Sequence, residues 1–251
     1  MEVNSLLAEK INERAKRRRL TVSMAKMRYA HNLFFKHFKG QKFPNALYVG
    51  VGHGHFALLS LLDEIADNIV GVDPYYDKDG NSEYEYEELI STINELKLEK
   101  RFKVVKSTVE EYLESVINER FDLIVLSDVL HHIYDSRVLL TESSSWHECI
   151  KLFSKLKDNS EPGAVMTIHE LQRHGLRPWL ARIGIINSNI NYDKKQNERQ
   201  WIKAAKQGGW KLDRIDTYIP HSCRNWGWLF NNWLGRYTLS NRYTIYFKNK
   251  G

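Results

Sequence analysis

Short apolar runs alternate with longer amphipathic stretches along most of this chain, from Ala46 onward. A run of four to eight apolar residues bounded by turn residues is typical of a buried strand, and apolar positions three to four residues apart are typical of a helix. Strands alternating with helices predict an α/β fold with a mostly parallel sheet. We expect seven strands: Ala46–Val49, Ile69–Val72, Phe102–Val105, Phe121–Leu126, Ala164–Ile168, Leu212–Tyr218 and Tyr243–Phe247.

The chain before this alternation has a different pattern. Between about Asn4 and Phe38 there is no proline or glycine, and the apolar residues recur mostly at helical spacings. We therefore expect residues 1–42 to form an arm or lid of two helices, ahead of a core domain over residues 43–251. Within the core, the alternation of strands and helices is interrupted near residues 172–197 and 221–241. We interpret these two segments as insertions that cap the scaffold.

Charge is distributed unevenly. Residues 1–42 hold 11 Lys/Arg against 3 Asp/Glu, and the rest of the chain holds 26 against 28. The run Lys16-Arg17-Arg18-Arg19 could contact phosphates or an anionic membrane surface, although such a run is more often simply solvated. The basic character of the protein therefore belongs to its arm.

Composition excludes several classes of protein. Hydrophobic residues make up 42% of the chain and charged residues 27%, which is ordinary globular composition. No run of about 18 apolar residues is present, and the amino terminus is too polar and basic for a secretory signal, so we expect a cytoplasmic protein. Cys149 and Cys223 lie too far apart for a zinc knuckle, and the histidines lack the H-E-x-x-H spacing, so we expect no metal.

A glycine-rich turn follows the first predicted strand. Gly50, Gly52 and Gly54 permit unusual backbone angles and a close approach of a ligand to the main chain. The dinucleotide fingerprint G-x-G-x-x-G would place its third glycine where His55 stands, so the spacing G-x-G-x-G favours S-adenosylmethionine over NAD. Asp73, nineteen residues after Gly54, ends the second predicted strand. Its carboxylate can accept hydrogen bonds from ribose hydroxyls, which both cofactors carry.

From about Ala46 to Phe247 the order of motifs resembles the class I S-adenosylmethionine-dependent methyltransferases. The segment Phe121–Ile133 is similar to the family's fourth-strand motif, and Glu161-Pro162-Gly163 resembles the turn that precedes its fifth strand. The resemblance implies a seven-stranded, mostly parallel sheet with helices on both faces and an antiparallel last strand. It also implies S-adenosylmethionine as the cofactor.

The resemblance further implies which residues bind that cofactor. The glycines would pass the backbone under it, Asp73 would hold the ribose, two residues would lie beside adenine, and one or two would lie near the methionine end. These residues are Gly50, Gly52, Gly54, Asp73, Thr108, Val109, Ser127 and Asp128. The sequence departs from the family at Tyr48 and Thr108, where the family usually has acidic residues.

Three histidines are candidate catalytic residues. Methyl transfer requires alignment of the nucleophile and, for a hydroxyl, removal of its proton, and imidazole has a suitable basicity near neutral pH. His132, which we rank first, and His131 lie just beyond the fourth strand, and His169 ends the fifth strand beside Glu170. The alternative is that these side chains only pack or are exposed.

The acceptor side is less defined. The two insertions are rich in basic and aromatic residues, and their arginines favour a small, anionic acceptor with an oxygen nucleophile. The tryptophans could line a pocket, pack the loop or form a dimer contact, so a homo-oligomer stays open. RNA or protein methylation is the alternative, without support from an N/D-P-P-Y/F motif. A further alternative function is that of a non-catalytic nucleotide-binding protein or an NAD-dependent enzyme. The arginines are Arg173, Arg177, Arg182, Arg224 and Arg236.

Overall fold

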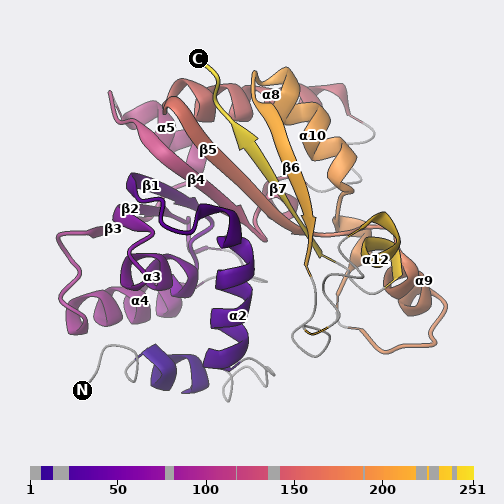
Figure 1. Ribbon diagram of the computed structural model, residues 1–251, viewed down its shortest axis with the longest axis horizontal. Coiled ribbons are helices and arrows are strands. Elements are labelled where there is room, and N and C mark those ends of the chain that lie inside the picture. Colours follow the sequence, from indigo (N-terminus) through magenta and orange to yellow (C-terminus); the bar gives the residue numbers. More distant parts are fainter. Residues whose placement is uncertain are drawn as a thin grey trace. The chain divides into compact units, whose positions relative to one another are not determined.

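Seven strands form the sheet, in the order β3-β2-β1-β4-β5-β7-β6. Strands β1, β2 and β3 pair in parallel, as do β4 and β5, whereas β7 runs antiparallel to both β5 and β6. The predicted α/β class, mostly parallel with an antiparallel last strand and with helices around the sheet, is confirmed (Figure 1). The strands are β1 (Phe43–Val49), β2 (Ala66–Val72), β3 (Phe102–Val105), β4 (Phe121–Ser127), β5 (Ser160–Leu171), β6 (Lys211–Thr217) and β7 (Arg242–Lys248).

This computed structural model describes residues 7–13, 23–76, 82–116, 118–134, 142–188, 190–218, 225, 232–238 and 242–251. The chain divides into two compact units, Met1–Tyr112 and Leu113–Gly251. The basic run Lys16–Arg19, the side chains of Arg224 and Arg236, and most of the tryptophan-rich loop lie outside the described residues.

Strand β5 differs most from its predicted extent. It begins at Ser160, so Pro162 and Gly163 lie inside the strand rather than in a turn before it. The reason is pairing across the sheet: the Gly163 N–H donates to the Asn249 carbonyl at 2.8 Å, and the Asn249 N–H donates to the Ala164 carbonyl at 2.8 Å. Gly163 has φ +86° and no atom near a built Cβ, so this irregular start is accommodated locally.

In the first unit, the helices of the arm follow the predicted pattern. Residues 7–13 are helical and bury Leu7 and Ile11, and α2 (Met24–Phe34) begins at the N-cap Ser23. A short turn, η1 (Lys36–Phe38), leads into β1. Helix α2 lies against α3 (His55–Leu62), which packs on β2, and α4 (Glu83–Glu95) follows β2 along the chain. Both predicted arm helices are therefore present.

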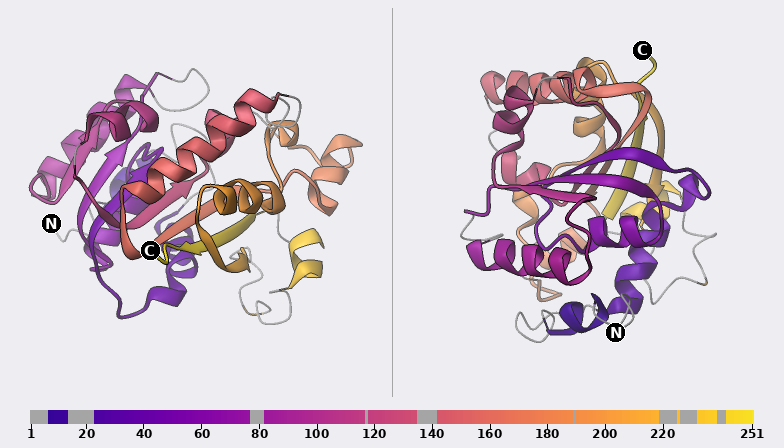
Figure 2. Two further views of the ribbon diagram at one scale, coloured as in Figure 1. Left: turned by 90° about the horizontal axis from the view of Figure 1, so that it is seen from above. Right: turned by 90° about the vertical axis from the view of Figure 1, so that its left-hand side faces the viewer.

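In the second unit, helix α8 (Ser143–Asp158) lies beside α10 (Glu198–Gln207) (Figures 1 and 2). Their interface buries Phe153 and Trp201, and the indole N–H of Trp210 donates to the Phe153 carbonyl at 2.9 Å. This contact is the core of the second unit's helical layer.

The two interruptions of the pattern hold short helices of their own. Residues 172–197 contain α9 (Leu176–Arg182) and the turn η2 (Tyr192–Lys194), and α12 (Trp233–Thr238) lies in the second interruption. Helix α12 contacts both α9 and β6. In the ranges that the structure covers, no helix has the length and apolar character needed to cross a bilayer.

Candidate functional site

The glycine turn after β1 depends on a backbone that side chains rarely adopt. Gly50, Gly52 and Gly54 have φ values of +68°, +51° and +68°. A Cβ on Gly54 would lie 2.4 Å from Cδ1 of Leu89, which is buried on α4. The turn therefore requires glycine at residue 54 for both conformation and space.

Asp73 is tied to this turn, as its position at the end of β2 predicts. Its Oδ2 accepts from the Gly52 N–H at 3.0 Å, its Oδ1 accepts from the Tyr75 N–H at 3.0 Å, and the Tyr75 hydroxyl donates to the Gly52 carbonyl at 2.7 Å. A carboxylate offers about four acceptor positions, so these two backbone bonds fix its orientation without exhausting its capacity. Asp73 is thus a preoriented acceptor beside the glycines.

Two histidines of the turn were not selected from the sequence. His53 and His55 are buried with their rings stacked at a centroid distance of 5.7 Å. His53 lies close to two acids of α4, with Nε2 3.8 Å from Glu85 Oε1 and Nδ1 3.5 Å from Glu88 Oε2. Only the tertiary fold places these two acids of α4 against the turn.

Tyr48, where the sequence departs from the family, joins the arm to the core. Its hydroxyl donates to Ser60 Oγ at 2.6 Å, and His31 Nε2 on α2 lies 2.9 Å from the same oxygen. His31 Nδ1 is 3.3 Å from Asp63 Oδ2. Burial raises the pKa of Tyr48 and lowers that of His31, so both side chains are neutral at neutral pH, next to the ionised carboxylate of Asp63. Tyr48 therefore has an anchoring contact of its own.

Thr108 caps helix α5 (Val109–Ser115). Its Oγ1 accepts from the Glu111 N–H at 3.2 Å, and Glu111 Oε2 accepts from the Thr108 N–H at 3.1 Å, which is the reciprocal capping box. Val109 is buried and Thr108 half-buried. The predicted adenine-side pair is thus held at a capped helix start.

A cavity of about 800 Å³ opens elsewhere in the first unit, between the end of α2, η1 and the turn after α3. Arg28, Lys36 and Asp63 are among the residues that line it. None of the predicted site residues does, so we do not assign this cavity to the chemistry.

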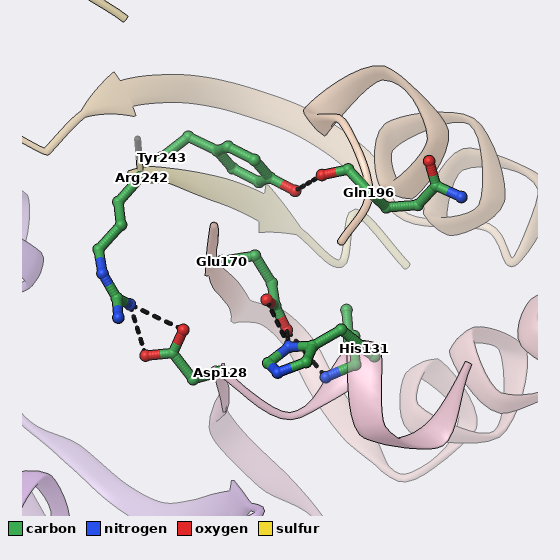
Figure 3. Close-up of polar contacts among 7 residues, drawn as sticks. Asp128, His131, Glu170, Gln196, Arg242 and Tyr243 are labelled. Carbon is green, nitrogen blue, oxygen red and sulfur yellow. Dashed lines mark hydrogen bonds and ion pairs between the residues drawn. The ribbon is translucent and has the colours of Figure 1, made fainter. Parts of the chain in front are cut away.

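In the second unit, the tip of β4 is fixed by charge and backbone. Asp128 has φ +53°, and its N–H donates to the His169 carbonyl at 2.8 Å. Arg242 Nη1, at the start of β7, donates to Asp128 Oδ1 at 2.7 Å and also to Oδ2 (Figure 3). Burial opposes ionisation of Asp128, but the charge and hydrogen bonds of Arg242, with the nearby His169 and His131, together outweigh it and hold its pKa at about 2. Ser127, which ends β4, is half-buried.

His131 and Glu170 form a buried pair beside this tip. His131 lies on the short helix α6 (Leu130–Ile133), and its Nδ1 is 2.8 Å and 3.1 Å from the two carboxylate oxygens of Glu170 (Figure 3). Glu170 also accepts from the Leu130 N–H at 2.9 Å. Because an ionised carboxylate can only accept, Nδ1 is the donor of this pair, and in the neutral imidazole Nε2 then carries the lone pair. This is the arrangement that an oriented general base requires.

The other two candidate histidines have different surroundings. His132 is exposed, with its ring 4.2 Å from that of His131. His169 points to the opposite side of β5 from Glu170, because successive strand residues alternate, and its Nδ1 is 2.9 Å from Thr244 Oγ1. Burial, with the Arg242 charge, lowers the pKa of His169 to about 4, so it is a weak base at neutral pH. The contacts therefore single out His131.

Segment 195–197 is tied to β7 and was also missed by the sequence analysis. The Tyr243 hydroxyl donates to the Gln196 carbonyl at 3.0 Å, which ties the segment to β7 (Figure 3). Lys195 and Gln196 are both buried. Among the described residues, no cluster of three His, Cys, Asp or Glu is arranged to hold a metal ion.

Comparison with known proteins identifies one family. Residues 12–236 match the family described as "Methyltransferase domain". The sequence matches none of the curated proteins at a significant level.

Many solved structures share the fold. The N-methyltransferase NodS from Bradyrhizobium japonicum WM9 is 12% identical, with a TM-score of 0.56 over 89% of this chain and 96% of its own, and was also solved with S-adenosyl-L-homocysteine. The cyclopropane synthase MmaA2 from Mycobacterium tuberculosis is 13% identical, with a TM-score of 0.58 over 87% of this chain and 82% of its own. An O-methyltransferase family protein from Burkholderia thailandensis is 12% identical, with a TM-score of 0.58 over 90% of this chain and 58% of its own.

Proposed function

Because this chain belongs to the class I S-adenosylmethionine-dependent methyltransferase family, we propose that it methylates a hydroxyl oxygen of a small molecule, with His131 as the general base. The observation that carries this proposal is the buried pair of His131 with Glu170. The names of the similar structures include both N- and O-methyltransferases, so they do not choose the nucleophile.

The glycine turn fits the family's cofactor. All three glycines of the motif have positive φ values. Asp73 is oriented by two main-chain N–H groups, which suits a ribose whose two hydroxyls donate hydrogen bonds to it. S-adenosylmethionine, when bound, supplies a methyl group on a positively charged sulfur. Thr108, Val109, Ser127 and Asp128 stay proposed contacts for its adenine and methionine ends.

His131 is suited to take the proton of the acceptor hydroxyl. As the methyl group moves to oxygen, that proton passes to Nε2, while Nδ1–H continues to donate to Glu170. The carboxylate of Glu170 fixes the tautomer before the reaction and stabilises the imidazolium that forms, the role that a buried carboxylate has in a catalytic triad. Glu170 is therefore a positioning residue.

The acceptor is proposed to be small and anionic. The basic residues of the insertion before α10, among them Arg173, Arg177 and Arg182, support a negative charge on it. Methylation of RNA or protein gains no support, because the basic run that suggested it lies outside the described residues.

The proposal is tested by isotope transfer. The protein is incubated with S-adenosylmethionine labelled in its methyl group and with a panel of matched hydroxyl and amine compounds, and products are analysed by mass spectrometry. We expect the label on oxygen. His131→Ala should lower kcat by about 100- to 10,000-fold, the usual contribution of a general base, with calorimetric affinity for S-adenosylhomocysteine unchanged.

His147→Ala is the matched control, because His147 is an exposed histidine on α8 whose Nδ1 lies 2.6 Å from the Ser143 carbonyl of its own helical turn. It should keep wild-type turnover. Label found on nitrogen or carbon, or His131→Ala turning over at the wild-type rate, would overturn the assignment.

A further inference from the structure

Exposed apolar side chains gather in one part of the second unit. Of the eight large apolar side chains that are exposed in the described part of the chain, six lie on α9, on the turn after it or on α12. The two helices contact each other and lie at the periphery of this unit (Figures 1 and 2). We call these six residues the apolar patch. They are Leu176, Trp179, Ile183, Ile185, Leu234 and Tyr237.

Helix α9 carries apolar side chains on the face that a surface helix usually makes polar. Leu176, Trp179 and the C-cap Ile183 are 36%, 52% and 50% exposed. Their spacings of three and four residues place them on one side of the helix. Pro178 is the buried residue of α9, so the helix packs on the protein by another side. A contiguous apolar stripe in water is unfavourable and marks a surface that binds a protein or a membrane.

Helix α12 and the turn after α9 extend this stripe. Leu234 and Tyr237, three residues apart on α12, are 51% and 50% exposed, and Ile185 in the turn is 66% exposed. A Cβ built on Gly175, the N-cap of α9, would lie 3.1 Å from the Tyr237 carbonyl oxygen. Because α12 approaches the start of α9 this closely, the apolar side chains of the two helices belong to one surface.

The charges around the apolar patch are nearly all positive. Arg177 and Arg182 are exposed, and the 3.6-residue repeat of the helix places them on opposite flanks of the stripe. Arg182 donates to the Arg173 carbonyl at 3.2 Å and pairs with Asp193 at 2.9 Å. Asp193 is the single acid of the insertion at residues 172–197, which holds five Lys/Arg. The patch is therefore apolar along its centre and cationic along its edges.

This combination fits the surface of an anionic bilayer. Apolar side chains can enter the boundary between head groups and acyl chains, while guanidinium groups bind the lipid phosphates. Tryptophan is enriched at that depth because its ring is apolar and its N–H is polar.

Other partners match only part of the surface. A second copy of this chain would set the same cations against one another across a two-fold contact, and like charges repel. The phosphates of a nucleic acid would bind the arginines but would leave the apolar side chains without an apolar partner.

We propose that α9 and α12 bind a membrane surface that contains anionic phospholipids. Trp179 and Ile183 enter the interface, and Arg177 and Arg182 contact lipid phosphates. The contact is peripheral, since α9 spans seven residues and a bilayer-crossing helix needs about 20. This binding goes beyond the proposed function and does not depend on it, because it requires neither the cofactor nor His131.

The test is flotation of the full-length protein with lipid vesicles, in the absence of S-adenosylmethionine. One set of vesicles is phosphatidylcholine alone, and the other is phosphatidylcholine mixed with phosphatidylglycerol, which carries the negative charge. We expect the protein to bind the mixed vesicles about tenfold or more tightly than the neutral ones. Added salt should weaken binding to the mixed vesicles, because it screens the attraction between arginines and phosphates.

Two variants separate the apolar and the charged parts of the surface. Trp179→Ser should weaken binding to the mixed vesicles by about tenfold, because an aromatic ring no longer leaves water, and Trp179→Phe should keep most of the affinity. Arg177→Gln should weaken binding by about fivefold, the effect of one cation near an anionic surface. Both side chains are exposed, so the variants should melt at the wild-type temperature.

Tyr84→Ser and Arg120→Gln are matched controls that should bind as the wild type does. Tyr84 is 57% exposed on α4, and Arg120 is exposed just before β4. Equal binding of the wild type to both kinds of vesicle, wild-type binding by Trp179→Ser, or full competition by soluble glycerol phosphate would contradict the proposal. A dimer that Trp179→Ser converts to a monomer in analytical ultracentrifugation, without vesicle binding by the wild type, would assign the patch to a second copy and overturn it.

Discussion

Replacing Gly54 by alanine tests how strictly the cofactor turn is specified. Gly54 has φ +68°, and a Cβ there would lie 2.4 Å from Leu89 Cδ1. Because Leu89 is 1% exposed on α4, its side chain cannot move aside into solvent. The substitution therefore carries both a backbone cost and a packing cost.

Each cost has a known size. An L-residue in the left-handed region costs about 1–2 kcal/mol, and overpacking a buried site costs about 1–3 kcal/mol. Gly54→Ala should thus lower the free energy of unfolding by about 2–5 kcal/mol. Gly40 offers a matched control, with φ +78° and no atom within 4 Å of a built Cβ. Gly40→Ala should lose only the backbone part, about 1–2 kcal/mol.

Urea denaturation of both variants measures the difference, which should be about 1–3 kcal/mol because the gain from a stiffer unfolded chain is common to both. Adding Leu89→Ala isolates the clash between residues 54 and 89. Leu89→Ala should lower the free energy of unfolding less in the Gly54→Ala background than in the wild type, again by about 1–3 kcal/mol. Equal losses for Gly54→Ala and Gly40→Ala, with no coupling to Leu89, would refute the argument that space at the turn is limiting.

Two further predictions concern stability. His31 has its pKa lowered below the ordinary value of 6.5, first by burial, so the unfolded chain binds a proton that the folded chain resists. The free energy of unfolding should therefore fall as pH drops below 6.5, by at most about 1.4 kcal/mol per pH unit, and this slope should be smaller in His31→Gln. Parallel urea-denaturation curves against pH for the two proteins would contradict it. Thr108→Ala should cost about 1 kcal/mol by removing the cap of α5, whereas Thr108→Ser should keep most of it; thermal melting compares them, and equal losses would show that the cap contributes nothing.

Local patterns predicted the parts of this protein that local rules control. Alternation of apolar runs found all seven strands, because each buried strand must be apolar whatever it pairs with. The glycine spacing found the turn, since positive φ values are open mainly to glycine. Asp73 lies beside the turn because strand ends in a parallel sheet meet at one edge, and its bond to Gly52 spans only 21 residues.

Two departures from the family became intelligible only in three dimensions. Tyr48 donates to Ser60 in a network that reaches His31 on the arm, and Thr108 is committed to capping α5. Neither role follows from comparing residue types at a motif position, because hydrogen-bond partners depend on which helix packs over the strand.

The candidate base and its surroundings depended on the fold even more. His131, His132 and His169 could be named from the sequence, but our ranking put His132 first, because the partner of each ring was not visible in the sequence. Glu170 lies 39 residues from His131, and Arg242 lies 114 residues from Asp128. Such pairs are set by strand order and by the direction of β7, which no periodicity encodes.

The sequence by itself thus determined the class of fold, the glycine turn, the carboxylate behind it and the histidines at the strand ends. Only the tertiary structure decided which of these histidines lies against the buried carboxylate of Glu170. The physical reason is that local conformation and burial depend largely on residues close by in the sequence. The charge environment of a side chain, in contrast, is the sum of groups brought together from distant parts of the chain.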